Sequence, residues 1–265
     1  MPSSLDTIMK SEESTYSLEL SSAELRWLAG TLGLIHLPFS DDNLRNLSCT
    51  DAGLSDAQAS LQRRGLIHRA AGLGWEVDRL PTAIIRWLGT ADKMLSMETY
   101  LHDGNSRRVY SLVDGKIGMS VTPDSDVYRF VLYQSIDALL MGLMNSIGAP
   151  RADTQPDSRC FDIPQPMIII PTAWRDSNLA KQILQRSGVE RKKTDILSSW
   201  LVSLRWAAAL TSVQLGTISP ESKLQNIVCS GPKGLWLCKV SKASELCSFT
   251  CMTYEDVRLV LRNLL

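Results

Sequence analysis

The pattern of hydrophobic and polar residues divides the middle of the chain into four β-like runs followed by one helix-like run. Asp103-Gly104-Asn105 and Asp114-Gly115 separate the first runs and indicate hairpin turns, because glycine and asparagine tolerate positive φ angles. The same order returns near the C-terminus. The expected strands are 94–101, 107–113, 116–122 and 126–133 before a helix at 135–147, and 210–218, 224–230, 234–240 and 245–251 before a helix at 254–265.

Short sequences also recur between the two halves, in the same order along the chain. Residues 61–65 (LQRRG) resemble 184–188 (LQRSG), 85–87 (IRW) resemble 204–206 (LRW), and 115–119 correspond in position to 231–235. Three matches in order, each with strands and a helix after it, favour an internal duplication over chance.

The N-terminal half begins with helix signals. Ser21 and Glu24 have the spacing of a capping box, and Gly33 is placed to end the helix in the left-handed conformation. A second shorter turn of helix is expected around Leu44 and Leu47, and Ser55 with Gln58 repeats the capping box for a helix that ends at 65. The segment 66–77 then indicates a short hairpin, so this half is expected to be winged-helix-like.

Residues 148–172 contain five of the eleven prolines of the chain. This proline density argues against a regular helix or a central strand, although the apolar run 167–170 allows an edge strand or a docked segment. We therefore predict a flexible tail at 1–20, an N-terminal α+β half at 21–147, a Pro-rich connector at 148–172 and a C-terminal α+β half at 173–265.

The pattern of apolar residues in the expected strands indicates which faces of the sheet are buried. Residues 127–133 are nearly all apolar, which indicates cover on both faces, whereas Ile117, Met119 and Val121 alternate with polar or small residues and indicate one open face. Two four-stranded blocks could join by their edges into one large twisted sheet with helices on one side. The predicted fold class is therefore α+β, with a pseudo-symmetric duplication of helices, a four-stranded antiparallel sheet and a helix.

Composition adds few functional constraints. The 28 basic and 28 acidic residues leave no net charge, so no global field attracts nucleic acid or a membrane surface, although a local basic patch is compatible with this balance. No secretory signal and no membrane-spanning run is present, which predicts a cytoplasmic protein. The six cysteines match no zinc motif and are expected to be buried free thiols.

No catalytic motif, cofactor loop or metal-ligand pattern was found, so we expect no enzyme activity, no cofactor and no metal. Residues 230–234 superficially resemble a phosphate-binding loop but lie between strands and indicate a hairpin turn. The alternative function is a winged-helix DNA-binding regulator, since Arg63, Arg64, His68 and Arg69 cluster near the expected wing. The neutral charge and the lack of a recognition helix rich in Arg, Asn and Gln argue against nucleic-acid binding.

The first helix carries a resemblance to a known family. Residues 24–34 (ELRWLAGTLGL), followed by Leu37-Pro38, resemble the opening of EspG proteins, the cytoplasmic chaperones associated with type VII (ESX) secretion. The strand-to-helix passage ending near Ile147 is also similar, and the order of elements resembles that family over most of the chain. This resemblance implies a two-half fold with a central antiparallel sheet, no catalytic site, and binding to the helical tips of secreted PE–PPE type proteins.

The expected function is thus a non-enzymatic chaperone or adaptor, monomeric or homodimeric, that binds a helical protein partner. The expected contact residues lie on the turns at the rim of the sheet and on the strand beside the first turn. They are Asp103, Gly104, Asn105, Gly118, Met119, Ser219 and Glu221. Met119 would offer an adaptable apolar contact and Gly118 close access to the backbone, while the alternative is that Met119 packs in the core.

Overall fold

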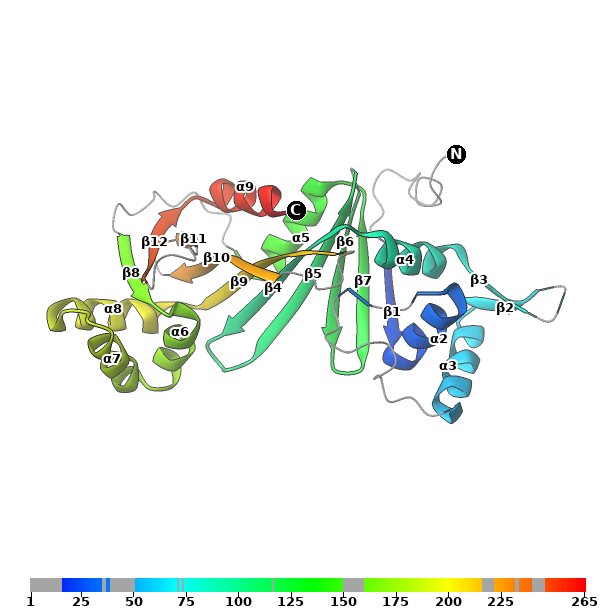
Figure 1. Ribbon diagram of the computed structural model, residues 1–265, viewed down its shortest axis with the longest axis horizontal. Helices are drawn as coiled ribbons and strands as arrows, with labels where there is room; N and C mark the ends of the chain where they lie inside the picture. Colours follow the sequence, from blue (N-terminus) through cyan, green and yellow to red (C-terminus); the bar gives the residue numbers. More distant parts are fainter. Residues whose placement is uncertain are drawn as a thin grey trace. The chain divides into compact units, whose positions relative to one another are not determined.

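The computed structural model describes residues 16–34, 37–38, 51–70, 72, 74–115, 117–149, 160–215, 222–231, 234–239 and 246–265. The chain forms two compact units whose segments alternate along the sequence. Figure 1 labels the helices and strands of both units. Unit 1 comprises Met1–Met94, Tyr110–Leu139 and Leu215–Ile218, and unit 2 comprises Leu95–Val109, Leu140–Gln214 and Ser219–Leu265. The sequence-based division falls instead at residues 148–172.

Unit 1 begins with a strand and a capped helix. Its elements are β1 (Tyr16–Ser21), α2 (Ser22–Leu32), α3 (Asp51–Arg63), β2 (Ile67–Arg69), β3 (Trp75–Val77), α4 (Arg79–Thr90), β6 (Ile117–Asp124) and β7 (Val127–Tyr133). The capping box of α2 is confirmed, because the Glu24 amide donates to the Ser21 hydroxyl and the Ser21 amide donates to the Glu24 carboxylate. Gly33 ends the helix at φ 78°.

The wing-like hairpin β2–β3 is present between α3 and α4, where the sequence predicts it. Helix α3 starts at Asp51, four residues before the capping box predicted at Ser55, so that boundary was wrong. The short helical turn expected around Leu44 lies outside the described residues. At the corresponding place in the second half, only residues 187–190 separate α7 (Ser177–Arg186) from α8 (Arg191–Ser203), too few for a comparable hairpin.

Unit 2 contains the remaining elements. These are β8 (Cys160–Pro164), α6 (Pro166–Arg175), α7, α8, β9 (Trp206–Gln214), β10 (Ser222–Gly231), β11 (Gly234–Lys239), β12 (Leu246–Met252) and α9 (Tyr254–Leu264). Three further elements, β4 (Lys93–Leu101), β5 (Ser106–Asp114) and α5 (Ile136–Ser146), run from one unit into the other.

Ten strands form one large sheet, in the hydrogen-bonded order β1-β7-β6-β5-β4-β9-β10-β11-β12-β8. The pairs at its two edges, β1–β7 and β12–β8, are antiparallel. The expected α+β class and the joining of two blocks into one sheet are therefore confirmed. The four-stranded blocks were incomplete, because β1 and β8 each add a fifth strand that precedes the helices of its half.

The recurring sequences do not all occupy matching elements. Segments 61–65 and 184–188 both end a helix and both finish on a glycine with positive φ. Residues 85–87, however, lie in α4, whereas Trp206 begins β9. The strand predicted at 210–218 accordingly starts four residues too late. This difference removes one of the three matches that favoured a duplication.

Residues 160–175 correct the prediction of an irregular connector. Cys160–Pro164 forms the edge strand β8, and Pro166–Arg175 forms α6 although Pro171 lies inside it. Pro166 occupies the first turn, where the missing amide hydrogen has no helical acceptor. The buried face of α6, which includes Ile169, Ile170 and Ala173, gains enough from packing to offset the hydrogen bond lost at Pro171.

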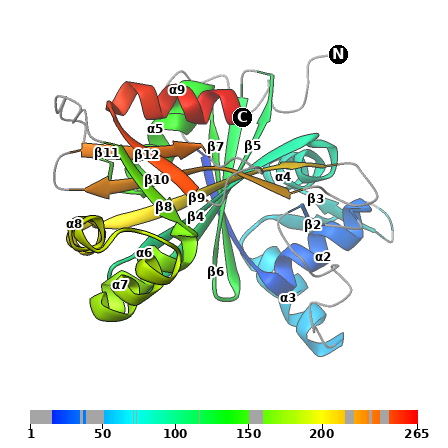
Figure 2. The same ribbon diagram turned by 60° about the vertical axis from the view of Figure 1, so that its left-hand side comes forward.

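The core of unit 2 lies between α6–α8 and one face of strands β8–β12, and Figure 2 shows these helices grouped beside β8. Trp200, Trp236, Phe161 and Phe249 stack there with ring centroids 4.7 to 5.7 Å apart. Aromatic contacts of this kind contribute about 0.5–1.5 kcal/mol each beyond burial. These contacts hold the helix bundle against the sheet.

Candidate functional site: the β4–β5 turn and helix α6

The turn between β4 and β5 is held by its own hydrogen bonds. The Leu101 amide donates to the Asn105 carbonyl at 2.9 Å, and the Gly104 amide donates to the Leu101 carbonyl at 3.0 Å. The Asn105 amide also donates to the Asp103 carboxylate at 2.9 Å, which forms an Asx turn. Gly104 has φ +87°, so the glycine predicted for this turn is required by the backbone. Three predicted contact residues therefore form one ordered turn.

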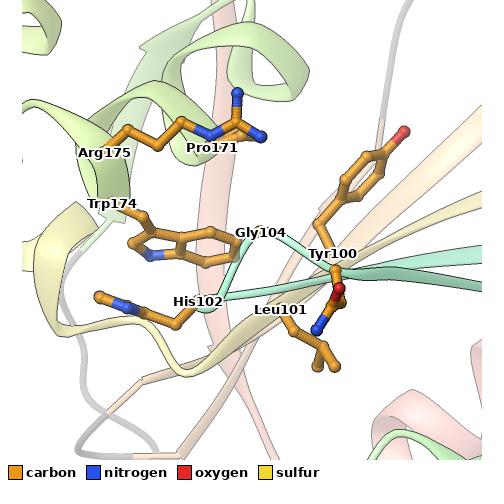
Figure 3. A pocket seen from close by; sticks show the side chains of 8 residues that line it. Tyr100, Leu101, His102, Gly104, Pro171, Trp174 and Arg175 are labelled. Atoms are coloured by element: carbon orange, nitrogen blue, oxygen red, sulfur yellow. The ribbon is translucent and has the colours of Figure 1, made fainter.

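Helix α6 lies next to this turn within unit 2. The ring centroids of His102 and Trp174 are 5.6 Å apart, and Figure 3 shows the Trp174 ring extending from α6 toward the turn. The Trp174 indole donates to the Leu201 carbonyl of α8 at 3.1 Å, which fixes its orientation. A Cβ added at Gly104 would lie 3.7 Å from the Arg175 guanidinium. The turn and the helix therefore form one contiguous surface.

A small pocket opens where the turn meets α6. Its lining residues come from β4, the turn and α6, namely Tyr100, Leu101, His102, Gly104, Asn105, Pro171, Trp174 and Arg175 (Figure 3). The volume open to water-sized groups is about 30 Å³. That space suits one or two waters or the tip of a single side chain, and it is far below the size of a cofactor site.

Local hydrogen bonds set the charges around the pocket. The backbone amide and the side chain of Asn105 hydrogen-bond Asp103 and hold the pKa of its carboxyl below the usual value. Burial and the neighbouring Glu98 raise the pKa of Tyr100, so its hydroxyl remains protonated at neutral pH. Glu98 itself pairs with Arg108 across the hairpin at 2.9 Å. The site thus combines an anionic turn with the Arg175 cation.

Exposed apolar side chains lie on the same two elements. Leu101 at the end of β4 and Ile168 on α6 are exposed, Ile168 to 57%. Isolated exposed aliphatic residues are common on proteins, but Leu101 lines the pocket. Ile168 precedes Pro171 and Arg175 by three and seven residues and so lies on the same face of α6 as these two lining residues. This combination of apolar, aromatic and arginine side chains is typical of protein-binding surfaces.

Two of the predicted contact residues are not on a surface. Met119 is 0% exposed and pairs with Leu112 and Leu132 on the neighbouring strands. A Cβ at Gly118 would stand 2.7 Å from the Leu139 side chain of α5, so this glycine admits the protein's own helix, not that of a partner. The structure therefore agrees with the alternative interpretation, in which Met119 packs in the core. The remaining predicted residues, Ser219 and Glu221, lie outside the described residues.

Sequence reasoning missed His102, Trp174 and Arg175 as members of the site. A signal was present, because Ile170 and Trp174 have the spacing of successive turns on one helix face. Proline density was instead interpreted as evidence against a helix at 148–172, so the helix face that runs from Ile170 to Trp174 was not recognised.

The basic cluster behind the DNA-binding alternative is largely engaged within unit 1. Arg64 pairs with the buried carboxylate of Glu24 at 2.8 Å and also donates to the Glu19 carbonyl. Arg69 lies over the Trp75 ring at 5.6 Å, and His68 is 3.4 Å from Glu76. These contacts reduce the positive charge available to phosphate groups.

Metal and thiol chemistry find little support in the described ranges. Within those ranges, no group of three or more His, Cys, Asp or Glu side chains is arranged to hold a metal ion. The prediction of burial is confirmed for Cys229, Cys238, Cys247 and Cys251, whereas Cys160 is exposed. Burial raises the pKa of Cys238 to about 12, so its thiol is protonated and unreactive. Cys49 lies outside the described residues.

Comparison with known proteins gives a structural likeness only. No protein-family model and no curated protein matches the chain. Among solved structures, the type VII secretion system chaperone EspG5 of Mycobacterium tuberculosis, in complex with the PE25–PPE41 dimer, is similar with a TM-score of 0.59 and 16% identity. The match covers 92% of this chain and 94% of EspG5. The two chains therefore share a fold over nearly their whole length, which fits the resemblance in the first helix.

Across the described ranges, no helix combines the length and the apolar character that a membrane span requires.

Proposed function

We propose that this chain is an EspG-like cytoplasmic chaperone or adaptor, a non-enzymatic module that binds a helical protein partner. The observation that carries the proposal is the surface formed by the β4–β5 turn and α6, where an ordered turn, two aromatic rings and the exposed Leu101 meet. The shared fold with EspG5, which is itself solved with a PE25–PPE41 dimer, supports the same class of partner.

The site fits a helical segment better than a small molecule. The pocket of about 30 Å³ accepts only the tip of one side chain, whereas Ile168 and Leu101 extend the contact surface beyond it. An amphipathic helix could place one apolar side chain near Trp174 and others on Ile168, at the spacing of successive turns. Asp103 and Arg175 would then set the orientation through charged rim contacts.

An internal duplication is part of this proposal. Apart from the hairpin β2–β3, the described residues of each half form a first strand, a set of helices, four further strands and a final helix in the same order. A duplication followed by divergence would explain why only one half carries the wing-like hairpin and the other carries the α6 surface.

The test measures binding to PE–PPE type helical dimers encoded in the same genome, with purified proteins and isothermal titration calorimetry. Ile168→Glu should weaken binding by at least ten-fold, because it places a carboxylate in the proposed apolar contact. Leu259→Glu on α9 is the matched control, since Leu259 is also 57% exposed on a helix. The control should bind like the unmodified protein, and both variants should keep the melting temperature.

Absence of binding to every such dimer would overturn the chaperone proposal. Equal affinity for Ile168→Glu and Leu259→Glu would retain a partner but exclude the α6 surface as its site.

A further inference from the structure

A second surface of unit 2, at the junction of α7 and α8, is strongly basic in a chain with no net charge. Residues 181–196 contain five basic and two acidic residues, a net charge of +3. Arg186, Arg191, Lys192 and Lys193 are all exposed. Asp195 pairs with Lys181 at 2.9 Å, and Glu190 pairs with Lys193 at 3.6 Å. The two acidic residues therefore offset only two of the five basic charges.

The position of these cations is unfavourable for the helix itself. Three of them occupy the first turn of α8, which contains no acidic residue, and the positive end of the helix dipole repels cations there. The N-cap residue Glu190 makes no side-chain capping hydrogen bond. The exposed ion pair between Lys193 and Glu190 offsets only a small part of this cost. A locally unfavourable arrangement of this kind is typical of functional sites.

An exposed aliphatic side chain adjoins the cations. Ile196 follows Lys192 and Lys193 by four and three residues, so it lies beside both on the helix surface, and it is 59% exposed. The α7–α8 surface, defined here as Arg186, Arg191, Lys192, Lys193 and Ile196, therefore combines positive charge with a protruding apolar group.

We propose that the α7–α8 surface binds an anionic phospholipid bilayer peripherally. Acidic headgroups would neutralise the four cations, and the boundary between headgroups and acyl chains would accept Ile196. Nucleic acid supplies phosphates but makes no use of Ile196, and protein interfaces are depleted in lysine at their centres. The contact is weak and reversible, because one such patch carries neither a lipid anchor nor a spanning helix. This proposal departs from the expectation, based on zero net charge, that no membrane is a partner.

The experiment is flotation of the full chain with vesicles of phosphatidylglycerol and phosphatidylcholine, compared with vesicles of phosphatidylcholine alone. The protein should float with the anionic vesicles at low salt and be released at high salt. The charge reversal Arg191→Glu/Lys192→Glu/Lys193→Glu should lower vesicle affinity roughly a hundred-fold, because each basic residue near an anionic surface contributes about five-fold. Acidic residues suit the first helical turn, so this variant should remain folded.

A matched triple reversal in unit 1, Arg63→Glu/Arg79→Glu/Arg86→Glu, changes the total charge equally at exposed sites and should leave flotation nearly unchanged. Ile196→Ser should weaken binding while keeping the salt dependence. Equal loss in both triple variants, or equal binding to neutral vesicles, would refute the proposal. Tighter binding to duplex DNA than to vesicles, unaffected by Ile196→Ser, would assign the surface to nucleic acid instead.

Discussion

The substitution Met119→Asp probes whether the centre of β6 is core. Met119 is 0% exposed, so the change removes a buried side chain worth about 1.5–3 kcal/mol and places an unpaired carboxylate beside Leu112 and Leu132. Uncompensated buried charge costs on the order of 3–5 kcal/mol. The sum, on the order of 5 kcal/mol, is comparable to the whole stability of many domains. Thermal unfolding should therefore shift down by roughly 10–20 °C, or the protein should fail to fold.

The measurement is circular dichroism on heating, together with near-ultraviolet spectra at low temperature. Met141→Asp is the control, because it makes the same chemical change at a methionine on α5 that is 42% exposed. It should shift the melting temperature by no more than about 2–4 °C. A Met119→Asp protein that melts within that same range, and loses only partner binding, would show that Met119 is a contact residue and that the core assignment is mistaken.

Three further outcomes test the packing and the caps. Gly118→Val should cost about 1–3 kcal/mol in urea unfolding because its side chain would collide with Leu139, and the cost should shrink in a Leu139→Ala background. Arg64→Met should cost about 1–3 kcal/mol by leaving the buried Glu24 carboxylate unpaired, and the double variant with Glu24→Gln should recover part of it; strict additivity would contradict the ion pair. Hydrogen bonds from the N-cap threonine lower the pKa of Asp256, so its contribution to α9 is present above about pH 4 and is lost as pH falls through the lower folded-state pKa. Amide exchange in α9 should show this loss, and Asp256→Asn should abolish it.

Local signals predicted most strands but not all of them. The hairpin turns predicted the bounds of strands β4 to β7 and β10 to β12 to within about two residues of those in the structure. This succeeded because Gly104, Gly115 and Gly234 mark turns with positive φ. Strands β1 and β8 were missed because they are short and are stabilised by distant partners, not by a neighbouring hairpin. Helix α6 was missed because packing of its apolar face outweighs the local penalty at Pro171.

The sequence predicted the β4–β5 turn of the candidate site but not the contribution of helix α6. Asp103, Gly104 and Asn105 carry a turn signal in consecutive residues, and the structure places them in that turn. The contact between His102 and Trp174 joins segments about seventy residues apart, and no local pattern encodes it. Met119 was placed wrongly for another reason. The alternation of apolar and polar residues indicates which residues share a face of the strand, but it does not indicate whether that face is covered.

The pairing of β1 with β7 bears on how the chain folds during synthesis. Ser21 pairs with Val127, more than a hundred residues further along the chain, whereas β6 and β7 are joined by a short turn. The hairpin can form as soon as it leaves the ribosome, but β1 must wait, unpaired, until β7 has been made. Its polar residues Ser17 and Glu19, which alternate with the buried Leu18 and Leu20, then protect the nascent chain from edge-to-edge aggregation.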